Sequence, residues 1–169
     1  MTLYYFDASA LVKYYVTEPG STWIRQLIDA QDSTTGQPHH IILIAEITRV
    51  EVAAGLAVIE RVGRIRKAAR NRAYRRFISQ LIHRYAIIPL VAEDFETASR
   101  LTQNHPLRAY DAVQLTVALR YHRLLAGYQH TCIFVSGDDT LLTAARTEEL
   151  STDNPFDHIS PEDIPGRPV

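Results

Sequence analysis

Short apolar runs alternate with longer helix-forming segments along this chain, and this alternation limits the possible folds more than any other feature. We expect buried strands at Thr2–Phe6, Ile41–Ala45, Ala86–Leu90 and Thr131–Val135. Strands that are separated in this way by helices form a parallel sheet with helices on both faces. The sequence therefore predicts a three-layer α/β fold around a central, mostly parallel sheet of four to five strands.

The segments between these runs have helical composition. They are Ala8–Thr17, Ser21–Ala30, Glu46–Tyr85, Ala92–Asn104, Arg108–Leu125 and Asp138–Leu150. A single helix over Glu46–Tyr85 would be about 60 Å long, too long for one domain, so we expect an antiparallel pair that breaks near Gly55 or Gly63. Ser9 and Ser21 are the expected N-caps of the first two helices.

Length and composition indicate one domain. The 169 residues contain no linker that would divide them, and a chain of this size buries enough surface for a core. We expect one α/β domain over residues 1–150. A tail over residues 151–169 holds four of the eight prolines. We expect it to pack on or trail the same domain, with a short strand at Phe156–Ile159.

The chain shows none of the features of a secreted or membrane protein. Its single cysteine, Cys132, excludes an internal disulfide, which fits a reducing compartment. No apolar run approaches the roughly 18 residues that span a bilayer, and the first residues lack a basic start. We therefore expect a cytoplasmic protein without a membrane association.

Four acidic residues occupy positions where a carboxylate needs an explanation. Asp7 follows the first strand, and Asp138 follows the strand Thr131–Val135. The carboxyl ends of parallel strands, where ligands bind, lie at one edge of the sheet. Glu51 and Asp111 are flanked by apolar helical residues, where an uncompensated carboxylate is costly. Four such acids together would repel one another, and hard divalent cations such as Mg²⁺ or Mn²⁺ would remove that repulsion.

Each acid also has a simpler explanation when it is taken alone. Asp7, Asp111 and Asp138 would serve as helix caps, and Glu51 would pair with an arginine. For a single acid the two explanations have about even odds. Their joint occurrence at corresponding ends of the elements favours a shared site.

Four sequence blocks resemble those of PIN-domain proteins, and in particular the VapC toxins of bacterial toxin–antitoxin pairs. They are FDASALVKYYVTEPGS (Phe6–Ser21), ITRVEVAAGL (Ile47–Leu56), LRAYDAVQLTVAL (Leu107–Leu119) and FVSGDDTLLTAA (Phe134–Ala145). Each block is degenerate alone, but the four occur in the family order. The resemblance implies a PIN-like fold and a metal-dependent endoribonuclease that uses Mg²⁺ or Mn²⁺.

The resemblance also implies roles for individual residues. By motif position, the catalytic and metal-binding set is Asp7, Glu51, Asp111 and Asp138. Ser9 and Ser136 match small hydroxyl residues near the metal. Asp139 competes with Asp138 for the fourth position, although the spacing Ser136-x-Asp138-x-x-Leu141 favours Asp138.

Partners follow mainly from the same resemblance. It implies an RNA substrate and a small cognate antitoxin that inserts an arginine or lysine into the acidic pocket. A homodimer is expected because the helical segment Ala53–Val62 is richer in aliphatic residues than one core requires. The RNA target, the antitoxin and the number of metal ions stay open.

Half of the 18 basic residues fall in one helical stretch between Glu60 and Glu93, which contains no acid. They are Arg61, Arg64, Arg66, Lys67, Arg70, Arg72, Arg75, Arg76 and Arg84. Such a run is either a solvated helix face or a surface that follows a phosphate backbone. Lys13 lies one helical turn beyond Ser9, so it either approaches the acidic site or is an ordinary exposed lysine.

Other functions fit the same acids less well. One is a nuclease that acts on DNA or structured nucleic acid, and another is a non-catalytic module that binds RNA or protein. A phosphorylated Asp7 is disfavoured, because phosphatases of that type have Asp-x-Asp and Asp7-Ala8-Ser9 lacks the second acid. The seven histidines show no zinc-ligand spacing.

Overall fold

The structure is a computed structural model, and it describes residues 2–164. Its strands are β1 (Thr2–Phe6), β2 (His40–Ala45), β3 (Ala86–Ile88), β4 (Cys132–Val135) and β5 (Ser151–Asp153). Its helices are α1 (Ala8–Tyr15), α2 (Ser21–Asp29), α3 (Thr48–Arg61), α4 (Lys67–Arg84), α5 (Ala92–Asn104), α6 (Ala109–Ala126) and α7 (Asp139–Thr147). Two 3₁₀ turns follow β5, namely η1 (Pro155–His158) and η2 (Pro161–Asp163).

The five strands form one sheet in the order β3-β2-β1-β4-β5, and every neighbouring pair is parallel. This confirms the predicted α/β fold with a central sheet of four to five strands. β1 lies in the middle, and its last residue, Phe6, is paired with Val135 at the end of β4. The carboxyl ends of these two strands therefore lie side by side at one edge of the sheet.

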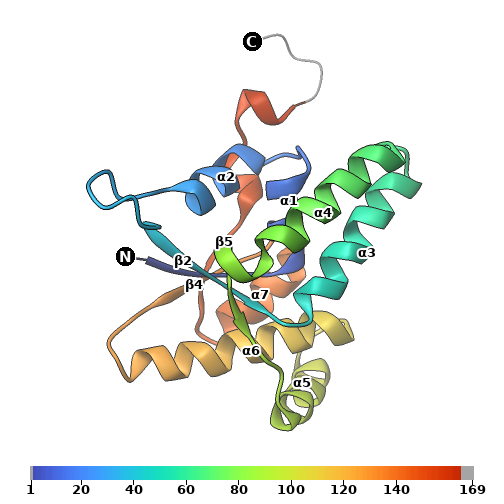
Figure 1. Cartoon of the computed structure of the whole chain (residues 1–169). Coiled ribbons are helices and arrows are strands. Elements are labelled where there is room, and N and C mark those ends of the chain that lie inside the picture. Colours follow the sequence, from blue (N-terminus) through green and yellow to red (C-terminus); the bar gives the residue numbers. More distant parts are fainter. Residues whose placement is uncertain (1, 165–169) are drawn as a thin grey trace.

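Helices cover both faces of the sheet, as Figure 1 shows. One apolar core lies between the sheet and α1–α4 and includes Phe6 and Ile44. The other lies between the sheet and α5–α7 and includes Tyr5 and Phe134. Neighbouring residues of a strand point to opposite faces, so a continuous apolar run fills both cores.

The helical stretch Glu46–Tyr85 forms a pair of helices, and the break lies at Gly63. Its φ of 78° is in the left-handed region, which glycine adopts without a steric penalty. The backbone N–H of Arg64 donates to the carbonyl of Ile59 at 3.1 Å, which closes the end of α3. Gly55 lies inside α3, and the helix continues through it.

Neither expected serine cap is present. The N-cap of α1 is Asp7, whose carboxylate accepts from the backbone N–H of Ala10. The N-cap of α2 is Gly20, and the hydroxyl of Ser21 donates to the carbonyl of Val16 instead. Asp7 outcompetes Ser9 as a cap because it sits at the strand end, where the backbone is still extended.

The expected strand at Phe156–Ile159 is wrong. Strand β5 occupies Ser151–Asp153, and the chain then turns into the 3₁₀ turn η1. Asn154 caps this turn by accepting from the N–H of Phe156, and Pro155 is pre-organised for its first position.

No helix within residues 2–164 combines the length and the apolar character that crossing a bilayer requires.

Candidate active site

The site lies where β1 and β4 end. Asp7 follows β1 directly, and its backbone N–H donates to the carbonyl of Val135 at 3.1 Å. Ser136 follows β4 and is fully buried. Adjacent parallel strands therefore bring two polar residues from distant parts of the sequence together, as the strand ends predict.

Asp7 is buried, with 6% of its surface exposed, and its hydrogen bonds come from neutral groups. The hydroxyl of Ser9 donates to both carboxylate oxygens at 2.8 and 3.0 Å, and that of Ser136 donates to Oδ2 at 2.9 Å. The N–H of Ala10 completes the set at 2.9 Å. Among the described residues, no lysine or arginine forms an ion pair with this carboxylate. Its position is thus fixed by dipoles, while its charge is left without a cation.

Glu51 lies in the first turn of α3 and is held by a residue that sequence reasoning missed. Gln114 is buried on α6 and donates from Nε2 to Oε2 of Glu51 and, at 2.8 Å, to the hydroxyl of Thr48. The hydroxyl of Tyr5 on β1 donates to Oε1 of Gln114 at 2.7 Å. A buried relay therefore runs from the central strand to Glu51.

Asp111 and Asp138 both lie at helix N-termini. Asp111 is in the first turn of α6. Asp138 caps α7, with Oδ1 accepting from the N–H of Leu141 at 3.0 Å, and its own N–H donates to the hydroxyl of Ser136 at 3.0 Å. A carboxylate at this end of a helix is favoured by the helix dipole.

One open cavity of about 560 Å³ brings the four acids together. It is lined by Asp7, Glu51, Asp111 and Asp138. Ser9 also lines it, while Ser136 lies beneath Asp7. Asp139 is directed elsewhere: its Oδ1 accepts from Nδ2 of Asn154 at 2.9 Å, and it is not part of the cavity wall.

The electrostatics of the cavity raise the pKa of three of its four acids in the metal-free protein. Burial raises the pKa of Asp7 to about 6, although hydrogen bonds from Ala10, Ser9 and Ser136 lower it. Burial likewise raises the pKa of Glu51 to about 7, again against a hydrogen bond, here from Gln114. These carboxylates therefore lack the stabilisation that a nearby cation would supply.

The pKa of Asp111 is raised as well. Burial is the main cause, and the charge of Asp138 adds to it, while the nearby guanidinium of Arg108 acts in the opposite direction. Asp111 in turn raises the pKa of Asp7 and of Glu51. The four acids thus form one repelling group, as the sequence predicts for a cation site.

The donor chemistry of the cavity fits a hard divalent cation. All four side chains offer carboxylate oxygens, which Mg²⁺ and Mn²⁺ prefer. Within residues 2–164, no three His, Cys, Asp or Glu side chains close on a single point. Magnesium is usually held by one or two carboxylates and keeps several of its waters, so a ring of acids around a cavity suits it.

Lys13 is a buried cation in the wall of this cavity. It is 3% exposed and lines the cavity, so it is not an ordinary exposed lysine. Its Nζ lies 3.7 Å from Glu18, which in turn accepts from Arg64 at 2.7 Å. Nζ also lies 3.9 Å from the ring centroid of Phe156. Lys13 is therefore directed toward one side of the cavity and away from direct pairing with the four acids.

Sequence reasoning missed three residues of the site besides its acids. Gln114 lies one helical turn after Asp111 within an apolar stretch, and a buried amide in that position was a usable signal. Glu18 and Phe156 carried no such signal, because their approach to the cavity depends on the turn before α2 and on the tail after β5.

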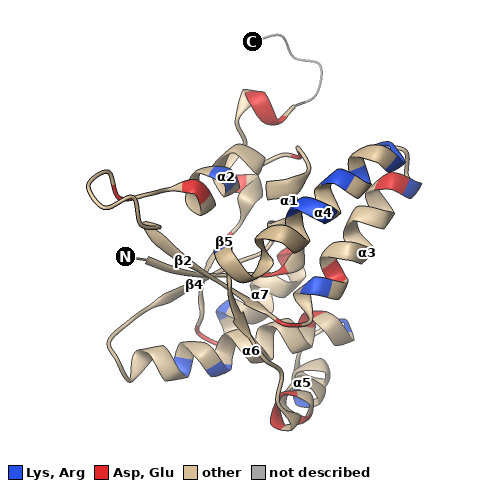
Figure 2. Ribbon diagram, in the orientation of Figure 1, with Lys and Arg blue, Asp and Glu red and all other residues tan. Residues whose placement is uncertain are grey.

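Figure 2 shows the basic stretch spread along α4 and the adjoining end of α3. Part of it is committed to local contacts: Arg70 pairs with Glu60 at 2.8 Å, and the guanidinium of Arg76 lies 4.8 Å from the ring centroid of Tyr14. The described cavity wall includes none of the nine basic residues from Arg61 to Arg84.

Comparisons with solved structures agree with this fold. PAE2754 from Pyrobaculum aerophilum superposes with a TM-score of 0.57 at 18% identity, over 93% of this chain and 91% of the other. VapBC2 from Rickettsia felis, bound to a DNA fragment from their promoter, gives 0.56 at 14% identity over 90% and 98%. FitAcB from Neisseria gonorrhoeae gives 0.56 at 16% identity over 92% and 99%. At these identities the likeness concerns the fold.

A search of curated proteins found no match. The sequence model of the PIN domain matches residues 4–146, which is most of the chain and includes all four acids of the cavity. The order of the four blocks, the parallel sheet and the acidic cavity at its carboxyl edge agree with that match. This chain therefore belongs to the PIN domain family.

Proposed function

We propose that this protein is an endoribonuclease that hydrolyses RNA phosphodiester bonds with Mg²⁺ or Mn²⁺, and that it is the toxin of a toxin–antitoxin pair. Members of the PIN family are nucleases. The observation that carries the proposal is the set of four carboxylates around one cavity, with raised pKa values for three of them. A purely structural acid would have its charge compensated by a cation or by hydrogen bonds that keep its pKa low.

The residues of the cavity have distinct parts in this reaction. A bound divalent ion would activate water and stabilise charge on the phosphate. Asp7, fixed by Ser9 and Ser136, presents its carboxylate at the strand edge. Glu51 is oriented by the side chain of Gln114, which donates to it. Rigid placement of such ligands is what positions a phosphodiester for attack.

The choice of RNA over DNA rests on the resemblance to VapC toxins. The alternative substrate, DNA or structured nucleic acid, would use the same acids. Purified protein should cut a mixed RNA pool with Mg²⁺ or Mn²⁺ and stop when chelator is added. Products should carry 5′-phosphate and 3′-hydroxyl ends, because water attacks the phosphorus.

A matched pair of variants controls this experiment. Asp7→Asn should not cut, whereas Glu96→Gln, which changes an exposed acid on α5, should cut as wild type does. Cyclic phosphate ends formed in the presence of chelator would contradict the mechanism. Cleavage of a DNA pool with RNA left intact would instead support the alternative substrate.

The partner of the proposed toxin is a small antitoxin. Two of the similar folds belong to proteins named VapBC2 and FitAcB, and the first is bound to promoter DNA. By analogy, we expect a partner that places an arginine or lysine among the four acids, where it would replace the charge of the metal. A cytoplasmic location fits such a pair.

A homodimer is the proposed assembly. Aliphatic side chains are exposed on α3, at its C-cap and on α4, including Val50, Val62 and Ile82 at 59%, 64% and 74%. Exposed apolar surface marks an interaction site where it is contiguous, and a second copy of the chain is the proposed partner. Sedimentation should show dimers at roughly tens of micromolar, the weak end of specific association. Monomers alone at that concentration would contradict the dimer.

A further inference from the structure

The tail after β5 contributes an aromatic side chain to the acidic cavity. Phe156, in η1, lines the same cavity as Asp7 and Asp138 and remains 44% exposed. It lies outside residues 4–146, the part of the chain that matches the PIN family model. This wall of the cavity is therefore a feature of this chain beyond the matched domain.

The ring is in contact with two residues of the site. Nζ of Lys13 lies 3.9 Å from its centroid, within the range of a cation–π contact. A Cβ atom added at Gly137 would lie 3.2 Å from Cε2 of Phe156, so a residue other than glycine would crowd the ring. Gly137 directly precedes Asp138, and its N–H donates to the hydroxyl of Ser9 at 2.8 Å. The ring is thus within contact range of the acidic site.

The tail is tied firmly to the rest of the fold. Asp163 is fully buried and accepts hydrogen bonds from the backbone N–H groups of Gly20, Thr22 and Ser160 at 2.8–3.0 Å. Any side chain at Gly20 would clash with the carbonyl of Pro155 at 2.2 Å. The exposed Phe156 ring is therefore held in place before any ligand arrives, which lowers the entropic cost of binding.

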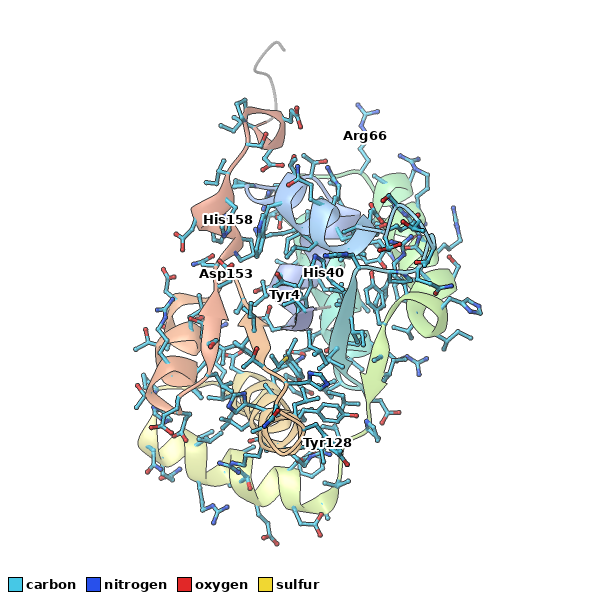
Figure 3. The ribbon with its side chains drawn as sticks, turned by 90° about the vertical axis from the view of Figure 1, so that its left-hand side faces the viewer. Tyr4, His40, Arg66, Tyr128, Asp153 and His158 are labelled. Atoms are coloured by element: carbon cyan, nitrogen blue, oxygen red, sulfur yellow. The ribbon has the colours of Figure 1, made fainter. Side chains whose placement is uncertain are left out.

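His158, at the end of η1, adds two further contacts. It stacks on Trp23 of α2 with ring centroids 4.2 Å apart, and its Nε2 lies 2.8 Å from Oδ1 of Asp153. Figure 3 shows His158 and Asp153 on the same side of the molecule, where β5 leads into η1. The C-terminal end of η1 is thereby attached to α2 and β5.

We propose that Phe156 and Lys13 form a nucleotide subsite, in which the ring stacks on a base of single-stranded RNA and the ammonium group faces a neighbouring phosphate. A nucleotide offers a π-face and an anion. Here the ammonium group of Lys13 lies over one face of the Phe156 ring, so a base would stack on the other face. Aromatic stacking on bases is the usual way in which proteins hold single strands. The subsite rests on the proposed ribonuclease function and deepens it.

Lys13 suits the phosphate because its charge is only partly used. Its contact with Glu18 is long, at 3.7 Å, while Arg64 is within 2.7 Å of the same carboxylate. The four carboxylates make the cavity negative, so an ammonium group in its wall offers an RNA phosphate a compensating positive charge. Base stacking and phosphate contact then place the strand beside Asp138.

The test measures binding of RNA to protein that cannot cut it. The probe is a fluorescein-labelled single-stranded oligouridylate of about twelve nucleotides, within the usual size of single-strand sites. A second set of probes replaces one base at a time by an abasic ribose. Affinities are measured by fluorescence anisotropy in the Asp111→Asn background, with and without Phe156→Ala.

We expect Phe156→Ala to weaken binding of the intact probe by about five- to hundred-fold, the usual effect of losing one stacked base. One abasic position should weaken binding to the Phe156-containing protein similarly and have no further effect on Phe156→Ala, because the two changes remove the same contact. Phe156→Trp should retain affinity, Phe156→Leu should not, and the exposed Phe95→Ala on α5 should have no effect. Lys13→Met should reduce the slope of log affinity against log salt concentration by about one, as expected for the loss of one phosphate contact.

Several outcomes would overturn the subsite. Additive effects of the abasic position and Phe156→Ala would do so, and so would full affinity in Phe156→Leu or no binding of the probe by folded protein. Unchanged RNA affinity with weakened binding of a protein partner would assign the ring to that partner. If wild type cuts RNA and Phe156→Ala cuts and binds RNA equally well, the subsite is rejected and the proposed function stands. A wild type that cuts no RNA rejects the proposed function itself.

Discussion

Two buried aspartates of this protein, Asp94 and Asp7, differ in the groups that compensate their negative charge. Asp94, in the first turn of α5, is 2% exposed and accepts from Nε of Arg120 at 2.8 Å and from Nη2 at 3.0 Å. Its Oδ2 also accepts from the backbone N–H of Val91. Asp7 is almost as buried, yet its donors are two hydroxyls and one N–H.

We interpret this contrast as one between a structural acid, Asp94, and a proposed catalytic one, Asp7. Asp94 has a cationic partner and a capping role, so its charge is satisfied within the fold. The pKa of Asp7 is raised to about 6 by burial, because its hydrogen bonds do not fully offset the loss of water. Clusters of such perturbed groups in a cavity are typical of active sites. Substitutions at the two sites should therefore have opposite consequences.

The largest expected effect is on cleavage. Asp7→Asn, Glu51→Gln and Asp111→Asn should each reduce RNA cutting by about a hundredfold or more, because each removes a carboxylate from the metal site. Asp94→Asn should leave cutting by the folded protein unchanged. Rates of cleavage of the same RNA pool, corrected for the folded fraction, provide the measurement.

The fourth acid makes the same comparison within one sequence block. Asp138→Asn should impair cutting much more than Asp139→Asn, since Asp138 lines the cavity and Asp139 contacts Asn154. The reverse order would show that Asp139 is the functional acid of this block.

A smaller effect, on stability alone, is expected at Asp94, whose charge is compensated by Arg120. Arg120→Met should lower the free energy of unfolding by about 2 kcal/mol, below the usual loss for a fully buried pair because Arg120 is partly exposed. It leaves the buried carboxylate of Asp94 without its cation. Urea unfolding checks the value, and an unchanged midpoint would mean that the pair contributes nothing.

The pH dependence of stability should reveal the uncompensated acids. A carboxyl group whose pKa is raised on folding binds its proton more tightly in the folded state. Between pH 4, near the unfolded value, and pH 7, the metal-free protein should therefore lose stability through Asp7 and Glu51. His40, whose pKa is lowered by burial, has the opposite slope. The comparison is accordingly with Asp7→Asn, which should show a shallower decline, and an equal or steeper decline would contradict the shift.

The smallest effect concerns the relay behind Glu51. Tyr5→Phe removes the hydroxyl that donates to Gln114, which leaves the amide oxygen unsatisfied at a cost of about 1 kcal/mol. If Gln114 orients Glu51, the Mn²⁺ concentration needed for half-maximal cutting should rise severalfold. Loss of stability with an unchanged Mn²⁺ requirement would make the relay purely structural.

How much the sequence predicted depended on whether the signal was local. Strand ends carry their own signal, so Asp7 and Asp138 were placed correctly at neighbouring strand ends. The caps were harder, because Ser9 and Asp7 are equally good cap residues and only the backbone at the strand end decides between them. Phe156 and Ile159 are isolated apolar residues that suggest a short strand, and the sequence does not reveal that Pro155 starts a 3₁₀ turn instead.

Contacts between segments that are far apart in the chain could not be predicted from the sequence. The relay from Tyr5 through Gln114 needs α6 to lie against the central strand. The approach of Phe156 to Lys13 needs the turn before α2 to accept the tail. The basic stretch is a further example: its charge is visible in the sequence, but the partners of Arg70 and Arg76 are not.

The most direct test is a set of four melting curves, for wild type and Asp111→Asn, each with chelator and with Mn²⁺. If the acids form a metal site, wild type should melt at rising temperature as Mn²⁺ increases. Asp111→Asn should melt higher than wild type in chelator, because repulsion is relieved, and should lose the response to Mn²⁺. A structural Asp111 predicts the opposite: a lower melting temperature in chelator and an intact response to Mn²⁺, and that result would contradict a metal site in this cavity.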